Sequence, residues 1–352
     1  MARPSLPFEQ LLSARSAYAP SFHPGGRRLA FISDLGGLPQ AWGVDLRGGW
    51  PRLLAYPDQR VTVVADAPRG GGLLVAMDRD GSERHQLVYV AEEGALTFLT
   101  RDPEVVHTFG AWAPDGRAVA YASNRRHPAF FDVYVQEVPQ GEARLVYQQD
   151  GSNSVAAWSP DGRYLVVSRA NTTQDNDLEL LDLRSGEAVP LTPHEGEAAY
   201  RGVQWAPDGR GLYLASSYGR EFLGLACLDL GTRRLTYLAE PEGDVEGVAL
   251  SPDGALLAYA VNQEGYSRLR VRHLGTGRER EVTGLPPCTL TDPRHEVALA
   301  WSRDGRRLAF TVNGPRHNPD VWVYDAARRV ARQATFSPTA GVPREALVAP
   351  EL

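Results

Sequence analysis

Patterns of catalytic residues are nearly absent from this sequence of 352 residues. A serine hydrolase needs Gly-x-Ser-x-Gly at a turn between a strand and a helix. The best match, Gly265-Tyr266-Ser267-Arg268-Leu269, lacks the final glycine. A zinc-protease helix needs His-Glu-x-x-His, and both His194-Glu195 and His295-Glu296 lack the second histidine. We therefore expect no catalytic residue, no metal site and no cofactor in this chain.

Acidic residues in one predicted hairpin loop raise the question of calcium binding. Asp175, Asn176 and Asp177 offer oxygen atoms, but the spacing and the terminal glutamate of an EF-hand are missing. We interpret them as a polar hairpin loop. Cys227 and Cys288 are the only cysteines, too few for a disulfide scaffold or a cysteine-rich metal site. A redox role for either thiol stays open.

Arginine carries the remaining candidate chemistry. All 37 basic residues are arginine, and the candidates among those in loops predicted between strands are Arg125, Arg126, Arg220 and Arg316. The planar guanidinium can bind a carboxylate through two parallel hydrogen bonds. These four residues are candidates for contacts with a peptide carboxylate or an acyl carbonyl. The alternative for each is a solvated loop charge or an interdomain ion pair.

A repeated turn positions these loops. A turn glycine recurs at spacings of 44 to 51 residues, at Gly26, Gly70, Gly116, Gly162, Gly209, Gly254 and Gly305. In four copies the turn reads Pro-Asp-Gly, in which proline presets φ, aspartate bonds the backbone ahead and glycine adopts positive φ. We assign a structural role in these turns to Asp115, Asp161, Asp208, Asp253 and Asp304.

A large apolar residue precedes the turn glycine by four positions in six of the seven copies. These residues are Phe22, Trp112, Trp158, Trp205, Leu250 and Trp301, whereas the second copy has Asp66. A bulky side chain at a fixed place in each repeat fits a residue wedged between neighbouring sheets. The repeat therefore predicts sheets that stack face to face.

The period predicts an all-β fold, a seven-bladed β-propeller of four-stranded antiparallel blades. Four strands of about five residues and their turns fill a period of about 40–50 residues, as in a propeller blade. An open β-solenoid or two sandwiches is the alternative. The seventh copy ends near Val330–Thr335, and the first already has four strands, so we expect a ring closed without strand exchange. The expected first-copy strands are Tyr18–Phe22, Arg28–Ser33, Gln40–Asp45 and Arg52–Ala55.

Strand order assigns the loops to two faces. The short Pro-Asp-Gly turns join the first two strands of each blade on one face. The loops between the second and third strands vary in sequence and lie on the other face, together with both ends of the propeller. Variable loops on a rigid scaffold are the usual place for binding.

Charge and hydropathy exclude some classes of partner. The net charge of −6 and the pI near 5.8 argue against nucleic acid and against anionic membranes. No apolar run approaches the ~20 residues needed to cross a bilayer, and Met1–Pro7 lacks the apolar region of a signal peptide. We expect a cytoplasmic protein.

Several stretches resemble known propeller families. Trp158–Leu165 and Trp301–Phe310 look like TolB/WD40-like repeats. Met77–Tyr89 is similar to the D-x-x-G-x-E-x-x-Q-L blade of acylaminoacyl-peptidase-like members of the prolyl oligopeptidase family. Thr335–Leu352 resembles the linker before the hydrolase domain of that family, and Phe8–Tyr18 resembles the segment that packs on it.

The resemblance implies a non-catalytic, substrate-gating role in a serine peptidase. In that family the propeller covers an α/β-hydrolase domain and admits short peptides to a Ser-His-Asp site. It implies an N-terminal segment at 1–17 that packs on the hydrolase, a propeller at 18–336, and a linker at 337–352 toward a hydrolase domain absent from this sequence. Its implied partners are that domain and short peptides, N-acylated ones among them, and self-association stays open.

Two other functions remain open from the residues. One is a free-standing protein-interaction scaffold of the TolB/WD40-like kind. The other is a propeller enzyme such as a lactonase, which needs a central metal site of acidic and asparagine ligands.

Overall fold

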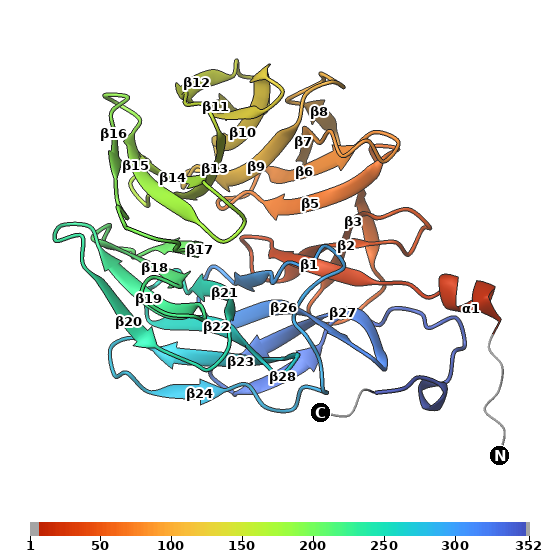
Figure 1. The fold of residues 1–352 in the computed structure, drawn as a ribbon. Helices are drawn as coiled ribbons and strands as arrows, with labels where there is room; N and C mark the ends of the chain where they lie inside the picture. The colour runs from red at the N-terminus through yellow and green to blue at the C-terminus, as the bar shows by residue number, and fades with distance from the viewer. Residues whose placement is uncertain (1–6, 350–352) are drawn as a thin grey trace.

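The computed structural model describes residues 7–349, and nearly all of their regular secondary structure is β-strand (Figure 1). One short helix, α1 (Phe8–Leu12), precedes the strands, and one 3₁₀ turn, η1 (Arg344–Ala346), follows them. The sequence-based ranges 1–17 and 337–352 extend, at 1–6 and 350–352, beyond the described residues. Among residues 7–349, no helix is long and apolar enough to span a membrane.

The strands come in consecutive groups of four along the chain. The first group contains β1 (Ala17–Phe22), β2 (Arg28–Ser33), β3 (Gln40–Asp45) and β4 (Arg52–Ala55). The next two contain β5 (Arg60–Asp66), β6 (Gly72–Asp78), β7 (Gln86–Ala91) and β8 (Leu96–Phe98), then β9 (His107–Trp112), β10 (Ala118–His127), β11 (Phe130–Glu137) and β12 (Arg144–Tyr147).

The later groups repeat this plan. The fourth contains β13 (Ser152–Trp158), β14 (Tyr164–Ala170), β15 (Asn176–Asp182) and β16 (Ala188–Pro190), and the fifth β17 (Tyr200–Trp205), β18 (Gly211–Ser216), β19 (Gly224–Asp229) and β20 (Leu235–Ala239). The last two contain β21 (Val245–Leu250), β22 (Leu256–Gln263), β23 (Tyr266–His273) and β24 (Glu279–Glu281), then β25 (Leu299–Trp301), β26 (Arg307–Gly314), β27 (His317–Asp325) and β28 (Val330–Gln333).

Hydrogen bonding gives five four-stranded antiparallel sheets and one eight-stranded sheet. The larger sheet joins the third and fourth groups through one parallel bridge, between Phe131 and Ser152. The strands expected for the first copy are confirmed, with β1 beginning one residue earlier, at Ala17. The fold is all-β, as the repeat predicts.

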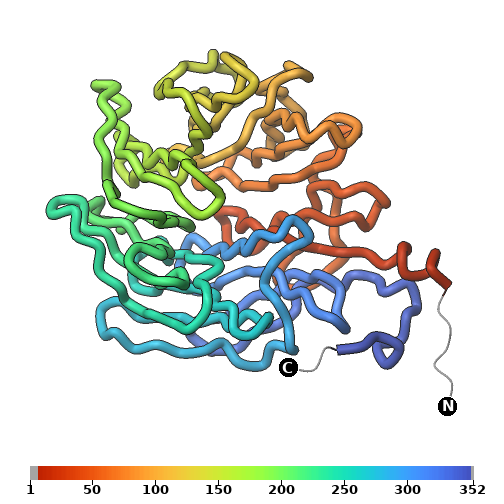
Figure 2. The backbone as a smooth tube through the Cα atoms, viewed as in Figure 1, coloured from red at the N-terminus to blue at the C-terminus, as the bar shows by residue number. Residues whose placement is uncertain are grey.

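The groups form a ring, mostly through their first strands (Figures 1 and 2), and the second and third groups are joined by contacts between β7 and β9. Strand β1 contacts β5, β9 contacts β13, β13 contacts β17, β17 contacts β21, β21 contacts β25, and β25 contacts β1 again. Where the ends of the chain meet, the backbone N–H of Ala19 donates to Thr311 Oγ1 at 3.1 Å. The first sheet contains only β1–β4 and the last only β25–β28.

The repeated turns use the aspartate side chain in one way. In each turn the Oδ1 atom accepts from the backbone N–H two residues ahead, as in Asp161 with Arg163 at 3.0 Å and Asp208 with Arg210 at 3.0 Å. The same contact occurs at Asp115, Asp253 and Asp304. The following glycine has positive φ, 75° at Gly162, a conformation that side chains with Cβ disfavour.

The repeat tryptophans lie between consecutive groups. Trp112, Trp158, Trp205 and Trp301 each pack against a core cluster built from their own strands and those of the preceding group. Two of them also bond that group: Nε1 of Trp112 donates to the Ala65 carbonyl at 3.1 Å, and Nε1 of Trp301 to the Ala249 carbonyl at 3.0 Å.

Some loops expected on the variable face are shorter than the sequence suggested. Strand β10 runs to His127 and pairs it with Phe130, after a shift in register beyond Ser123. Arg125 and Arg126 therefore lie on a strand, which corrects their expected place in a loop. Arg316 does lie in a connection, the short turn between β26 and β27.

Candidate functional site on the variable-loop face

Both terminal segments meet at one place on the variable-loop face, the face that carries the connections between the second and third strands of each group. The backbone N–H of Arg15 donates to the Pro338 carbonyl at 2.9 Å. Asn318 Nδ2, on β27, donates to the carbonyls of Arg15 at 2.8 Å and Pro338 at 3.1 Å. Figures 1 and 2 show the red N-terminal segment and the blue C-terminal segment on the same side of the ring.

Helix α1 lies beside this junction with its apolar residues in solvent. Gln10 Nε2 donates to the Ala340 carbonyl at 2.8 Å, which joins the helix to the C-terminal segment. Phe8 is 68% exposed and Leu12 64%, and no residue of the helix is buried. An exposed apolar helix on a fixed junction is a surface that another domain could cover.

Arg125 is held over aromatic rings. Its guanidinium lies 4.3 Å from the ring centroid of Tyr134, and its Nη2 donates to Tyr121 Oη at 2.9 Å. Tyr121 Oη donates in turn to Gln136 Oε1 at 3.1 Å. Next to this group, the buried imidazole of His107 stacks edge-on against Tyr121. Burial, with the positive charge of Arg125, lowers the pKa of His107 to about 4.

Arg126 is engaged within its own blade. Its Nε and Nη2 atoms donate to the two carboxylate oxygens of Asp132, at 2.6 and 3.0 Å. Its Nη1 donates to Asp150 at 3.0 Å. Because the Asp132 side chain is fully buried, this arginine supplies the charge that the buried carboxylate requires.

The other two arginines differ in whether their side chains are bonded within the fold or exposed to solvent. Arg220 lies over the ring of Tyr237 at 5.3 Å and donates through Nη2 to the Pro241 carbonyl at 3.1 Å. Arg316 is exposed and lines a small cavity of about 90 Å³ beside the terminal junction, with Arg344 and Phe336. The four candidate arginines come from three different groups of strands, so the fold does not gather them into one cluster.

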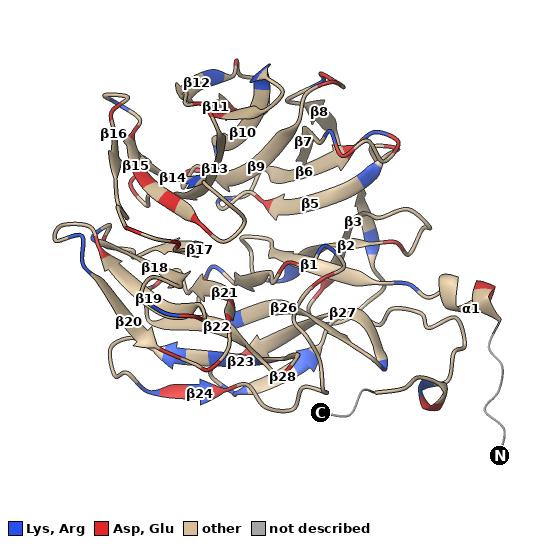
Figure 3. Ribbon diagram, viewed as in Figure 1, with Lys and Arg blue, Asp and Glu red and all other residues tan. Residues whose placement is uncertain are grey.

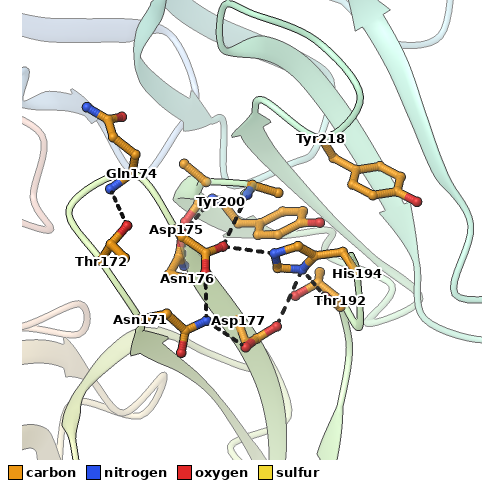
Figure 4. Close-up of polar contacts among 12 residues, drawn as sticks. Asn171, Thr172, Gln174, Asp175, Asn176, Asp177, Thr192, His194, Tyr200 and Tyr218 are labelled. Carbon is orange, nitrogen blue, oxygen red and sulfur yellow. Dashed lines mark hydrogen bonds and ion pairs between the residues drawn. The ribbon is translucent and has the colours of Figure 1, made fainter. Parts of the chain in front are cut away.

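A buried histidine joins the loop that the sequence presented as a polar hairpin (Figure 4). His194 Nε2 lies 2.9 Å from Asp175 Oδ1, and its Nδ1 lies 2.8 Å from the Thr192 carbonyl and 3.4 Å from Asp177 Oδ1. Asn171 Nδ2 donates to both aspartates at 3.0 Å. The side chain of His194 is only 3% exposed.

The surroundings of His194 favour its charged form. Burial alone lowers its pKa, but hydrogen bonds to Thr192 and Asp175 and the charges of Asp177 and Asp175 raise the pKa above its ordinary value. Both ring nitrogens face acceptors, and only the imidazolium donates from both. The cluster therefore fastens the β14–β15 loop to the connection that enters β17.

Sequence analysis missed this cluster because its partners are distant in the chain. The spacing around the aspartates was compared with an EF-hand, and that around His194 with a zinc-protease helix, so the two segments were never considered together. A signal was nevertheless available, since strand order places the β14–β15 loop and the segment before β17 on one face. Among residues 7–349, no group of three or more His, Cys, Asp or Glu side chains has the arrangement of a metal site.

Ser267, the serine of the near-miss motif, has a structural environment. It is 6% exposed, its Oγ donates to Glu246 Oε2 at 2.7 Å, and it accepts from the Leu290 backbone at 3.0 Å. Both cysteines are free thiols. Burial raises the pKa of Cys288 to about 11, which suppresses the reactive thiolate.

Charge is interspersed around the ring (Figure 3). Basic positions of β23 lie beside acidic positions of β24, where Glu279 faces Arg270 and Arg272 at 3.5 Å each. No single-sign face of the kind that nucleic-acid binding uses is visible in this view.

These sheets and their ring of contacts define a β-propeller. No family model matches the chain. Part of it is similar to "Uncharacterized peptidase YuxL" of Bacillus subtilis (strain 168), with 28% identity over 196 residues, covering 53% of this chain and 26% of that protein. A stretch of 99 residues is similar to Tol-Pal system protein TolB of Alcanivorax borkumensis, with 30% identity, covering 27% of this chain and 22% of TolB.

Solved structures match nearly the whole chain. Puromycin hydrolase gives a TM-score of 0.75 at 18% identity, over 97% of this chain and 57% of that one. A prolyl endopeptidase gives 0.74 at 13% identity, over 94% and 50%. Oligogalacturonate lyase in complex with manganese gives 0.71 at 14% identity, over 88% and 89%.

The matches to solved structures confirm the propeller fold. Together with the curated relatives, they confirm that the chain is similar to peptidases and to TolB. This chain spans about half the length of the prolyl endopeptidase and puromycin hydrolase structures. At these identities the structural match defines the fold alone.

Proposed function

We propose that this chain is the non-catalytic propeller of a serine peptidase of the prolyl oligopeptidase family, and that it limits access to a hydrolase domain. In this proposal the ring has seven blades, closed by packing without strand exchange, and the eight-stranded sheet counts as two blades. The substrates are short peptides, including N-acylated ones.

The junction of the terminal segments carries the proposal. Because Arg15 bonds Pro338 and both bond Asn318, a domain continuous with either segment would lie over the variable-loop face. The exposed apolar residues of α1 would then be covered by that domain. The two peptidase structures are similar over nearly this whole chain and continue beyond the matched part.

The arginines divide into two roles under this proposal. Arg126 and Arg220 maintain blade structure, since their guanidinium groups are committed to Asp132 and to Tyr237 with Pro241. Arg316 is the best candidate for contact with a peptide carboxylate or with the hydrolase, because it is exposed beside the junction. Arg125 is the second candidate.

The test uses the chain extended by its downstream coding sequence. A downstream Gly-x-Ser-x-Gly is expected, as is hydrolysis of acyl-amino-acid esters and short peptides by the extended protein. Residues 1–352 alone should not hydrolyse them. We expect Arg316→Ala to change how kcat/KM depends on peptide length. Arg303 is an exposed arginine on the opposite face, and Arg303→Ala should leave that dependence unchanged. Hydrolysis by residues 1–352 alone would overturn the proposal.

A free-standing interaction scaffold is the second candidate. The similarity to TolB over 99 residues favours it. A stop codon directly after Leu352 in the gene, with no hydrolase activity in the protein, would select the scaffold over the peptidase.

A further inference from the structure

A cavity of about 390 Å³ lies at the seam of the ring, between the last sheet and the first. Strands β26, β27 and β28 form one wall, and the β1–β2 and β3–β4 turns form the other. This cavity shares Gln333 and Phe336 with the small cavity beside the terminal junction, and none of its lining residues belongs to the His194 cluster.

Strand register explains the composition of the wall on the last sheet. Arg307 pairs with Asp325, which pairs with Val330, and Val323 pairs with Arg332. Residues opposite each other in register, and those two positions apart, share one face of a sheet. These five side chains therefore lie on the same face of the last sheet.

That face is covered around Val321 and open around Val330, on the outermost strand of the sheet. Val321, on the same face, is fully buried in a cluster with Ala17, Phe31 and Val44 of the first sheet. Farther out, Val330 is 43% exposed. The first sheet thus covers the part of the face around Val321 and leaves the cavity beside it.

The two carboxylates that line the cavity already have arginine partners. Arg47 donates to both oxygens of Asp45, at 3.2 and 3.3 Å. Arg328 Nε lies 4.0 Å from Asp325 Oδ2. Both pairs belong to hairpin turns at the mouth of the cavity.

Three further arginines line it without a carboxylate partner among residues 7–349: Arg27, Arg307 and Arg332. Arg307 Nη1 donates only to the Gly26 carbonyl, at 3.0 Å across the seam. Five arginines against two aspartates leave an excess of three positive charges around the cavity. Leu46, Val323 and Phe336 supply apolar surface.

We propose that this seam cavity binds an organic carboxylate with an apolar body. The apolar part would lie against Val323 and Phe336, and the carboxylate would bond the guanidinium groups of Arg332 and Arg27. A free fatty acid and an N-acylated amino acid share this chemistry. The proposal does not rest on the proposed peptidase function, because no hydrolase residue takes part.

Calorimetric titration of the 352-residue chain with octanoate tests the site, and 1-octanol serves as the uncharged analogue. We expect octanoate to bind and octanol to bind at least about tenfold more weakly, since one charge-assisted contact of about 1.4 kcal/mol changes affinity tenfold. The affinity for octanoate should fall as salt concentration rises. Titration with N-acetylphenylalaninate then distinguishes the two kinds of ligand. Tighter binding of octanoate indicates a fatty acid, and tighter binding of N-acetylphenylalaninate indicates an N-acylated amino acid.

Two matched variants locate the binding. Arg332→Ala should weaken octanoate binding by about tenfold. Arg303→Ala, which removes an exposed arginine of the same sheet outside the cavity, should not. Unfolding midpoints of both variants verify that the ring is intact. Equal binding of octanol and octanoate, equal effects of the two substitutions, or no binding of either carboxylate would each overturn the proposal.

Discussion

His194 Nε2 lies 2.9 Å from Asp175 Oδ1, and this contact joins two connections that are 19 residues apart in the chain. Asp175 also accepts from the backbone N–H of Ala198 at 3.1 Å. These two contacts hold the pKa of Asp175 below its ordinary value. The Tyr200 and Tyr218 rings meet the imidazole edge-on. The pair therefore couples the protonation of one imidazole to the position of a loop on the variable face.

His194→Gln should destabilise the protein more at pH 6 than at pH 9. The folded-state pKa of His194 is raised, so its stabilisation is fully present below about pH 6.5, the unfolded value. It is lost as pH rises through the folded value. A hydrogen bond to a charged group contributes about 1.5–3 kcal/mol. Chemical denaturation at both pH values measures the difference.

His273→Gln is the control for this prediction, because His273 is exposed and its ring makes no hydrogen bond among residues 7–349. It should have the same small effect at both pH values. Equal losses of stability at pH 6 and pH 9 in His194→Gln would contradict the charged histidine.

Arg126→Ala should strongly destabilise the third group of strands. The substitution leaves the fully buried carboxylate of Asp132 without its bidentate partner, and a buried charge without a partner is strongly destabilising. Adding Asp132→Asn should restore part of the loss, since no buried charge then remains. Free energies of unfolding for the two single variants and the double variant test this, and a purely additive double variant would refute it.

Asp66→Asn should stabilise the protein at neutral and alkaline pH. Asp66 occupies the position of the repeat's bulky apolar residue, and burial raises its pKa to about 7. Both of its carboxylate oxygens lack a partner among residues 7–349. The folded state holds the proton more tightly, so wild-type stability should fall as pH rises from about 4 to 7 and level off above.

The gain at pH 8 is at most about 4 kcal/mol, because one pKa unit corresponds to about 1.36 kcal/mol. Thermal unfolding between pH 5 and pH 8 measures it. Asp58→Asn, at an exposed position, should leave the pH dependence of the wild type unchanged. The prediction is wrong if Asp66→Asn retains the full wild-type slope.

Local chemistry made much of the fold predictable. The Pro-Asp-Gly turns and the apolar residue before them repeat at nearly constant spacing, so Trp158 and Asp161 reveal strand, turn and strand without any distant contact. The bridge between Phe131 and Ser152 has no such signal, because it depends on how two neighbouring groups are tilted. The extension of β10 through Arg126 could not be predicted from the sequence either, because it requires a shift in register between β10 and β11.

The candidate site was harder to predict than the fold. Asp175 and Asp177 read locally as a hairpin loop, and their partner His194 becomes apparent only when strand order is applied to both segments. Arg126 and Arg316 look alike in the sequence, yet one is committed to a buried carboxylate and the other is exposed. The difference lies in residue 132, which faces Arg126 only after the chain has turned back at β11.

Thr311→Val should weaken the closure of the ring. Thr311 Oγ1 accepts from the buried backbone N–H of Ala19, 292 residues away. Valine keeps the shape of the side chain but removes the acceptor, and an unsatisfied buried donor costs about 1–3 kcal/mol. Amide hydrogen exchange in β1 should accelerate relative to that in β17, on the far side of the ring. Thr311→Ser keeps the acceptor and should preserve the protection of Ala19. If both variants exchange β1 equally fast, the bond between Ala19 and Thr311 does not hold the seam.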